Sequence, residues 1–338
     1  MTNETFIIAE AGANHNRDKN LAFKLIDAAV NAKCNAVKFQ TYSSDTLYSK
    51  NTPDFAGYKN INKLIKDIEL PRNWQKDLKS YCDDSGIEFM STPFDEKAVE
   101  ELYNLGVKRF KVAGFEATDP RLVKIVAETQ LPMIVSAGIG VTLERIGLIT
   151  DWVLQKNKKP DLTFLHCNNA YPTPFEDICL GQIQIIKNTK FNYKIKVGLS
   201  DHTLGIIVPP LAVTLGAEVV EKHFTLDRNL PGPDHPFAIE PVELSDMVKN
   251  IRIAEKCLST KPELTDSERK FTFAMRSVVS KRQINKGEVF SLDNVTTKRP
   301  CLKNSVPAID FFNLIGKTSS RLIKEDEIVF SNDIREEF

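Results

Sequence analysis

Two short segments each end an apolar run in a histidine, and this pair has the clearest chemical meaning in the sequence. Residues 197–203 contain His202, residues 219–225 contain His223, and a helix-like stretch lies between them. If both runs are neighbouring parallel strands, the two imidazoles emerge side by side at one edge of the sheet. That arrangement presents a metal ion to a substrate, although a structural role for each histidine stays open from the residues alone.

Two histidines cannot fill the coordination shell of a metal ion, so water or substrate oxygens have to complete it. A mixed nitrogen and oxygen shell favours Mn²⁺, with Mg²⁺, Co²⁺ and Zn²⁺ as alternatives. The sequence therefore predicts a divalent cation, with manganese as the first choice, at His202 and His223.

The histidines belong to a regular alternation of short apolar runs and amphipathic helical stretches that extends to about residue 256. Most runs are continuously apolar, as expected for strands buried on both faces of a parallel sheet. Eight such units in about 250 residues predict a (β/α)₈ TIM barrel. A doubly wound open sheet is the alternative, but no Gly-x-Gly-x-x-Gly turn follows the first strand. The predicted strands are 6–10, 36–40, 88–91, 109–113, 133–136, 162–166, 194–199 and 218–223, and helical patterns include 20–32, 95–105, 119–129 and 142–156.

Polar side chains follow all eight predicted strands, at the end of a barrel where functional groups lie. Two lysines beside hydroxyl groups suit a phosphate and a carboxylate, but Lys38 and Lys111 could instead pair with Glu10 or Glu116. Glu10 closes an apolar strand and is the best candidate for a general acid and base. In chain order the polar groups at the strand ends are Glu10, Lys38, Gln40, Thr92, Lys111, Glu116, Ser136, Asn169, Tyr171, Ser200, His202 and His223.

A polar stretch at 260–266 separates the predicted barrel from a C-terminal region of short strands and turns. We predict a barrel domain at 1–258, a linker at 259–275 and a small β-rich domain at 276–338. The small domain contains a weak repeat, because residues 284–295 and 323–334 place similar residues at the same spacing. The repeat predicts two halves related by a pseudo-twofold axis.

The charge balance limits the classes of partner. Lys and Arg total 45, as do Asp and Glu, and a net charge of zero argues against nucleic acid or an anionic membrane. The N-terminus lacks the basic and apolar segments of a signal peptide, and no apolar run reaches the length of a membrane span. The six cysteines show no CxxC pairing, so we expect buried thiols in a cytoplasmic protein.

Several segments resemble motifs of the sialic acid synthase family, whose members condense phosphoenolpyruvate with an N-acetylated mannose-type sugar. The resemblance runs nearly from end to end. It implies a barrel followed by a small antifreeze-like domain of the SAF, or β-clip, type. The matching segments are 8–16 (IAEAGANHN), 37–41 (VKFQT), 91–94 (STPF), 166–174 (HCNNAYPTP), 198–203 (GLSDHT), 221–225 (EKHFT) and 231–235 (PGPDH).

The resemblance also implies a role for each candidate residue. By this resemblance His202 and His223 would ligate the metal, and Glu10 would be the acid and base. In a domain-swapped homodimer, Arg299 of the partner subunit would contact the sugar. Phosphoenolpyruvate would be held by Lys38, Thr92, Lys111, Ser136, Asn169 and Ser200, and the sugar by Gln40, Glu116, Tyr171 and Asp234.

The chain departs from the family pattern in two loops, and the identity of the sugar stays open. Residues 301–304 (CLKN) replace the usual glycines after Arg299, and Gly114 replaces a serine. Segments 169–174 and 231–235 resemble the sialic and legionaminic acid branches, whereas 41–47 and 111–119 resemble the pseudaminic acid branch. We therefore expect an N-acetylneuraminate or legionaminate synthase, with a pseudaminic acid synthase as the alternative.

Two other functions are compatible with the residues. A lysine Schiff-base aldolase is one, because Lys38 and Lys111 both lie at strand ends. The other is a carbohydrate-binding barrel without catalysis, although such a protein has little use for Glu10 and two histidines together.

Overall fold

The structure is a computed structural model and describes residues 4–54, 59–260 and 264–335. The chain divides into two units, Met1–Ser259 and Thr260–Phe338. Residues 261–263 of the predicted linker lie outside the described residues, as do residues 1–3, which enter the expectation about a signal peptide. The rest of the linker is partly helical, with α11 (Asp266–Arg269) and a 3₁₀ turn (Thr272–Ala274). The Thr265 hydroxyl caps α11 by accepting from the N–H of Glu268.

Eight parallel strands form one sheet in the first unit. Their order is β3-β2-β1-β8-β7-β6-β5-β4, and β3 packs against β4, so the sheet closes on itself. This closure confirms the predicted (β/α)₈ barrel and excludes the open doubly wound sheet. Every predicted strand is present, with ends within two residues of the expected ones. The strands are β1 (Phe6–Gly12), β2 (Ala36–Thr41), β3 (Glu88–Pro93), β4 (Phe110–Val112), β5 (Met133–Ala137), β6 (Leu162–Cys167), β7 (Lys196–Asp201) and β8 (Val219–His223).

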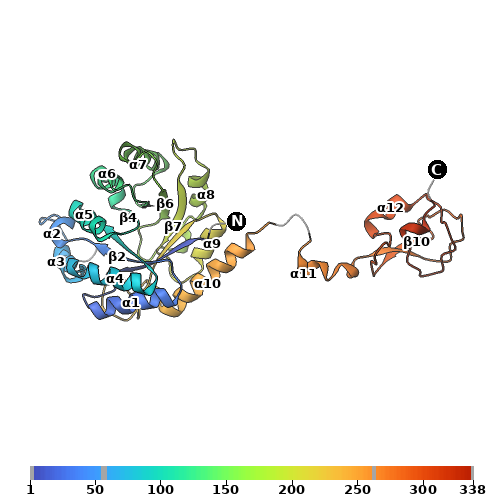
Figure 1. The fold of residues 1–338 in the computed structure, drawn as a ribbon, viewed down its shortest axis with the longest axis horizontal. Helices are drawn as coiled ribbons and strands as arrows, with labels where there is room; N and C mark the ends of the chain where they lie inside the picture. The colour runs from blue at the N-terminus through green and yellow to red at the C-terminus, as the bar shows by residue number, and fades with distance from the viewer. Residues whose placement is uncertain (1–3, 55–58, 261–263, 336–338) are drawn as a thin grey trace. The chain divides into compact units, whose positions relative to one another are not determined.

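Helices surround this sheet (Figure 1). Their starts follow sequence signals for capping: the Asp95 carboxylate accepts from the N–H of Ala98 at 2.7 Å, and Asp119 precedes Pro120 at the first turn of its helix. Two short helices, α2 and α3, precede α4 between β2 and β3. The helices are α1 (Lys19–Asn31), α2 (Ser44–Leu47), α3 (Ile61–Ile68), α4 (Gln75–Ser85), α5 (Glu96–Leu105), α6 (Pro120–Glu128), α7 (Leu143–Lys156), α8 (Gly181–Asn188), α9 (Val208–Thr214) and α10 (Pro241–Cys257).

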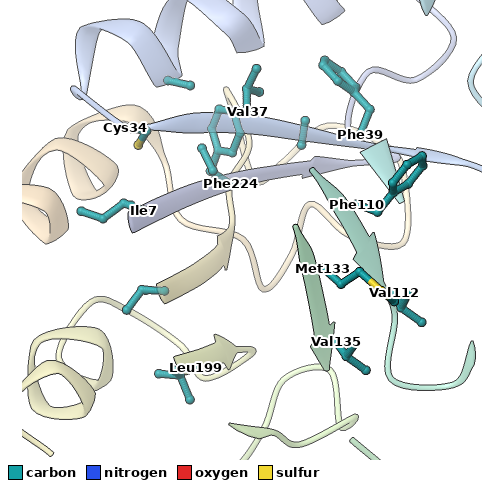
Figure 2. Close-up of a cluster of buried hydrophobic side chains, with 14 of the residues drawn as sticks. Ile7, Cys34, Val37, Phe39, Phe110, Val112, Met133, Val135, Leu199 and Phe224 are labelled. Atoms are coloured by element: carbon teal, nitrogen blue, oxygen red, sulfur yellow. The ribbon is translucent and has the colours of Figure 1, made fainter. Parts of the chain in front are cut away.

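The strand residues alternate between two buried environments, as the two-residue period of a strand requires. One set packs against the helices and includes Phe39, Phe110 and Val135 (Figure 2). Fully burying a side chain such as Phe39 stabilises the fold by about 1.5–3 kcal/mol. The other set forms a separate apolar cluster inside the barrel: Ile8, Ala36, Met90, Ile134, Leu165 and Val219, with Phe6 packed against it.

This alternation decides where the candidate site residues point. Glu10 comes two residues after Ile8, Lys38 two after Ala36, and Glu221 two after Val219. They therefore follow the apolar cluster on the inner face of their strands, toward the carboxyl ends. The interior of the barrel is therefore apolar toward the amino ends of the strands and charged toward their carboxyl ends.

The second unit contains the predicted repeat as a pair of matching halves. It holds β9 (Ser277–Ser280), β10 (Val295–Lys298) and α12 (Phe311–Leu314). Ile284 and Ile323, which are equivalent in the repeat, exchange both backbone hydrogen bonds, at 2.8 and 2.9 Å. Glu288 accepts from the N–H of Asn285, and its equivalent Glu327 accepts in the same way from Lys324. The two halves thus meet at equivalent residues, as the repeat predicts.

All six cysteines are free, but they are not all buried as we expected. Cys34, Cys82 and Cys167 are buried, whereas Cys179 and Cys257 are exposed and Cys301 is half-buried. Cys257 is the last residue of α10, beyond the part of that helix that packs on the barrel. Within the described residues, none of the helices has both the length and the apolar composition needed to cross a bilayer.

Candidate functional site

A cluster of ion-paired side chains occupies the barrel interior toward the carboxyl ends of the strands. The Nζ atom of Lys38 lies 2.7 Å from Oε2 of Glu10 and 3.0 Å from Oγ1 of Thr92. Gln40 donates to the other Glu10 oxygen at 2.9 Å. Lys38, Thr92 and Glu10 are almost fully buried, each at 1–2% exposure. The alternative that Lys38 pairs with Glu10 is therefore confirmed, and the pair is buried inside the barrel.

Glu221 joins the two lysines, and the sequence reasoning did not single it out. Its Oε1 lies 3.3 Å from Nζ of Lys111 and accepts from Ser200 Oγ at 3.1 Å, while Oε2 lies 3.7 Å from Nζ of Lys38. Strand alternation is the signal that could have found it, because Glu221 precedes His223 by two residues on the same face of β8. Lys111 pairs with Glu221, and no ion pair to Glu116 is found among the described residues.

The two carboxylates differ in their protonation. Burial raises the pKa of Glu10 from 4.5 to about 7, with Lys38 opposing and Glu221 adding to the rise. Burial also acts to raise the pKa of Glu221, but Lys111 and Lys38 outweigh it and the pKa lies below its ordinary value. Glu221 is therefore a fixed anion near neutral pH, whereas Glu10 can gain or lose a proton.

Lys38 is held in its charged form by its carboxylate neighbours. Burial acts to lower the pKa of Lys38, but Glu10 and Glu221 outweigh burial and raise it. A Schiff base requires a neutral amine, so this environment disfavours Lys38 as the nucleophile of an aldolase. A charged lysine instead suits the binding of an anionic substrate.

His202 and His223 lie together at the carboxyl ends of β7 and β8, with ring centroids 5.5 Å apart. His202 donates from Nδ1 to the carbonyl of Asn168 at 2.6 Å, since a carbonyl can only accept, and Nε2 keeps its lone pair. The buried Nδ1 of His223 has no hydrogen-bond partner among the described residues. Burial lowers the pKa of both histidines, well below the ordinary value for His223, so both rings are neutral.

Neutral imidazoles with available ring nitrogens are the form that binds a divalent cation. The donor set of this pair therefore fits a metal ion whose remaining ligands are oxygens. Within the described part of the chain, no cluster of three or more His, Cys, Asp or Glu side chains could hold an ion by itself. The two histidines would thus leave coordination positions open for other oxygens.

Aromatic rings and a carboxylate border the histidine pair. The ring centroid of Tyr171 lies 4.2 Å from that of His202, and the Phe237 centroid lies 5.1 Å from that of His223. Asp234 Oδ2 lies 3.9 Å from His223 Nδ1. Gly12 has φ +50°, and a Cβ there would lie 2.7 Å from Asp234 Oδ2, so this close approach requires glycine.

Asn169 is placed by a hydrogen bond and by the two glycines opposite it. Its Oδ1 accepts from the N–H of Ile139 at 2.7 Å. A Cβ at Gly138 would lie 2.0 Å from that oxygen, and one at Gly114 would lie 3.0 Å from it. A serine at 114 would require the Asn169 side chain to shift. Ser136, on the neighbouring β5, has a buried Oγ without a hydrogen-bond partner among the described residues.

Two candidate residues are not joined to this cluster. Glu116 lies in the first turn after β4 and lines a cavity of about 430 Å³ with Thr46, Phe94 and Asp95. Its buried Oε2 has no hydrogen-bond partner among the described residues. Arg299 belongs to the second unit, where it is exposed.

The loop after Arg299 has a defined shape despite lacking glycines. Ser305 Oγ accepts from the N–H of Leu302 at 3.0 Å and donates to its carbonyl at 2.8 Å. Asn304 adopts φ +66°, a left-handed conformation that asparagine tolerates. Asn304 thus takes a conformation otherwise typical of glycine.

Two protein-family models match this chain and together cover most of its length. The model of the NeuB family matches residues 25–263, and the SAF domain model matches residues 275–335. The chain belongs to the NeuB family. This confirms the resemblance to the sialic acid synthases, and the SAF match covers the unit that contains the repeat.

Relatives of this NeuB family member align over nearly its whole length. The N,N′-diacetyllegionaminic acid synthase of Campylobacter jejuni is 38% identical, with 96% of this chain and 99% of that protein covered. A pseudaminic acid synthase of the same species is 35% identical, with 98% and 97% covered. The crystal structure of an N-acetylneuraminic acid synthetase from Leptospira borgpetersenii, in complex with citrate, has a TM-score of 0.72 and 36% identity, with 79% and 90% covered.

Proposed function

We propose that this NeuB family member condenses phosphoenolpyruvate with an N-acylated hexosamine, giving a nine-carbon 2-keto acid and phosphate. The cluster of two buried lysines and two carboxylates beside a histidine pair carries this proposal. An N-acetylneuraminate or legionaminate synthase is the first choice for the product. A pseudaminic acid synthase is the alternative, since one such relative is 35% identical over 98% of this chain.

The charges inside the barrel suit a substrate with a phosphate and a carboxylate. Two ammonium groups face one fixed anion, Glu221, and one carboxyl group, Glu10, that can take up a proton. When Glu10 is protonated, the cluster has an excess of positive charge that a bound anion neutralises. Thr92, Ser136, Asn169 and Ser200 add hydroxyl and amide groups at neighbouring strand ends.

In the proposed reaction a carbon–carbon bond forms and a carbon–oxygen bond breaks. The enol carbon of phosphoenolpyruvate attacks the open-chain aldehyde of the sugar, and the aldehyde oxygen takes up a proton. Water adds to the oxocarbenium centre, and phosphate leaves as the C–O bond cleaves. Glu10, with a pKa of about 7, is suited to give the first proton and to accept one from the water. Lys38 and Lys111 offset the negative charge of the phosphate and carboxylate.

His202 and His223 would hold a divalent cation, with Mn²⁺ as the first choice and Mg²⁺ or Co²⁺ as alternatives. When bound there, such a cation would supply Lewis acidity for the sugar's aldehyde. The Nδ1 hydrogen bond from His202 to the Asn168 carbonyl fixes that ring, and the Tyr171 ring lies against it at a tilt of 42°.

For the sugar, we propose contacts with Gln40, Tyr171, Asp234 and Glu116, which border the cluster or follow nearby strands. Arg299 of the partner subunit would contact the N-acyl group within a domain-swapped homodimer. The exposed guanidinium of Arg299 has no hydrogen bond or ion pair within the ranges that the structure describes, which leaves it available for such a contact. We place the reaction in the cytoplasm, a reducing compartment in which the free cysteines persist.

The test is phosphate release from phosphoenolpyruvate against N-acetylmannosamine and diacetamido-trideoxyhexoses, with and without Mn²⁺. We expect release that requires both a sugar and the cation, and the preferred sugar identifies the product. A carbohydrate-binding barrel without catalysis releases no phosphate with any sugar. Borohydride in the presence of pyruvate would trap a covalent adduct on a Schiff-base aldolase, and we expect none.

A further inference from the structure

A buried ion pair lies immediately behind the two histidines. Asp201 is the last residue of β7 and comes directly before His202, and Lys222 comes directly before His223 on β8. The Cα atoms of Asp201 and Lys222 are partners in the register of the two strands. The Lys222 Nζ atom lies 2.7 Å from Asp201 Oδ2, and both side chains are at most 1% exposed. The preceding pair, Ser200 and Glu221, belongs to the charged cluster inside the barrel. By strand alternation, Asp201 and Lys222 lie on the opposite face, away from the substrate.

The same ion pair fixes the backbone on the other side of His202. Lys222 also donates to the carbonyl of Thr203. Asp201 Oδ1 accepts from the N–H and the hydroxyl of Thr203, at 3.0 and 2.9 Å. His202 therefore lies between Asp201, which belongs to the ion pair, and Thr203, which is hydrogen-bonded to both members of it. On the far side of His223, the N–H of Phe224 donates to the Glu10 carbonyl at 3.0 Å.

We propose that Asp201 and Lys222 are positioning residues that set the spacing of His202 and His223 for the cation. This inference rests on the proposed function, because it concerns the same metal site. A buried ion pair adds little net stability compared with apolar residues, and its best-attested use is to specify register. Register matters here because a slip of one residue between β7 and β8 would turn one imidazole away from the interior.

The test compares two double variants that each remove a cross-strand ion pair. Asp201→Asn with Lys222→Met removes both charges at nearly constant volume, and the asparagine oxygen can still accept from Thr203. The matched control is Glu88→Gln with Arg109→Met. Arg109 Nε lies 2.6 Å from Glu88 Oε1, and this pair is at the amino ends of β3 and β4, whereas the histidines are at the carboxyl ends of their strands. The readouts are Mn²⁺ affinity from the electron paramagnetic resonance of free Mn²⁺, phosphoenolpyruvate affinity without metal by calorimetry, and melting temperature.

We expect the Asp201–Lys222 double variant to fold and to bind Mn²⁺ about tenfold more weakly, the scale seen when groups behind metal ligands are removed. Its phosphoenolpyruvate affinity should match that of the parent, and the control should retain parental Mn²⁺ affinity. A folded double variant with parental Mn²⁺ affinity would overturn the positioning role alone. A double variant that does not fold would also overturn it, because the pair would then stabilise the barrel generally. Unchanged Mn²⁺ affinity in His202→Ala would overturn the metal assignment itself, and the positioning role with it.

Discussion

The Glu10 carboxylate lies 2.7 Å from the Lys38 ammonium group inside the barrel, and neither side chain is more than 3% exposed. A pair so deeply buried is uncommon unless its members have other partners, and here Gln40, Thr92 and Glu221 provide them. Glu10 lies beside Lys38 and is also the register partner of His223 on β8. A carboxyl group that can gain or lose a proton is therefore next to both the lysine and the histidine. The first prediction follows from this proton.

Glu10→Gln should lower kcat by roughly 10²–10⁴-fold, the range of general acid–base catalysis, with little loss of phosphoenolpyruvate affinity. Glutamine keeps the shape of the side chain and can still accept from Gln40, but it cannot transfer a proton. Phosphate release measures kcat, and calorimetry measures the affinity. Retained turnover would contradict the acid–base assignment.

Glu221→Gln should destabilise the fold by about 3 kcal/mol or more, because it leaves a buried lysine without a charged partner. Lys111 has no other ion pair in the described part of the chain. Added phosphate should raise the melting temperature of this variant more than that of the parent, since it replaces the missing anion. Differential scanning calorimetry with and without phosphate measures both effects.

The control for this experiment is Glu218→Gln, an exposed position just before β8. It removes one negative charge from the same segment and should change stability little. Equal melting temperatures for Glu221→Gln and the parent would show that the ion pair between Glu221 and Lys111 does not stabilise the folded protein.

Much of this arrangement could be predicted from the sequence, because a parallel barrel brings all its strand ends to one face. Glu10 and His223 each end a recognisable apolar run and Lys38 lies within one, so fold and site follow from the same pattern. Glu221 was missed because only the last residue of the eighth strand, His223, was considered there, although Lys38 and Lys111 hold the equivalent position, two residues before the end, in their predicted strands. The positions of Glu116 and Arg299 could not be inferred in this way, since they depend on a loop path and on a separate unit.

His202→Ala should abolish high-affinity Mn²⁺ binding, because a single remaining imidazole is a weak ligand for a divalent cation. A calorimetric titration of Mn²⁺ measures this loss. The matched control is His166→Gln, since His166 is also buried near the end of a strand but donates from Nε2 to the Ile178 carbonyl at 2.6 Å. An unchanged titration in His202→Ala, or an equal loss in His166→Gln, would count against metal ligation by the pair.

The contribution of Glu116 to stability should depend on pH. Burial raises the pKa of Glu116 from 4.5 to about 7, so the folded protein keeps a proton in this interval that the unfolded chain has lost. The carboxyl group therefore destabilises the fold progressively as pH rises through the interval, and the penalty is constant above it. Glu116→Gln removes this titration, so its advantage over the parent should grow from pH 4.5 to 7 and then level off.

Urea unfolding of Glu116→Gln and the parent at a series of pH values measures this difference directly. Glu100→Gln, at an exposed position of α5, controls for the loss of one negative charge. If the difference between Glu116→Gln and the parent is constant from pH 4.5 to 7, Glu116 does not hold a proton in the folded state.

The proposed domain-swapped homodimer predicts that two inactive variants restore each other. Glu10→Gln lacks the acid and base, and Arg299→Ala should lack sugar binding. In a mixed dimer, the barrel of the Arg299→Ala chain has an intact Glu10 and receives Arg299 from its Glu10→Gln partner. Subunit exchange in an equal mixture makes half of the dimers mixed, each with one intact site of two, so about a quarter of parental activity should return.

The readout is phosphate release after the two variants are co-expressed or refolded together, with each variant alone as the control. If Arg299 acts on the barrel of its own chain, no subunit carries both intact residues, and the mixture stays inactive. Recovery near a quarter of the parental rate therefore requires that Arg299 acts across the dimer, and its absence would contradict the swapped arrangement.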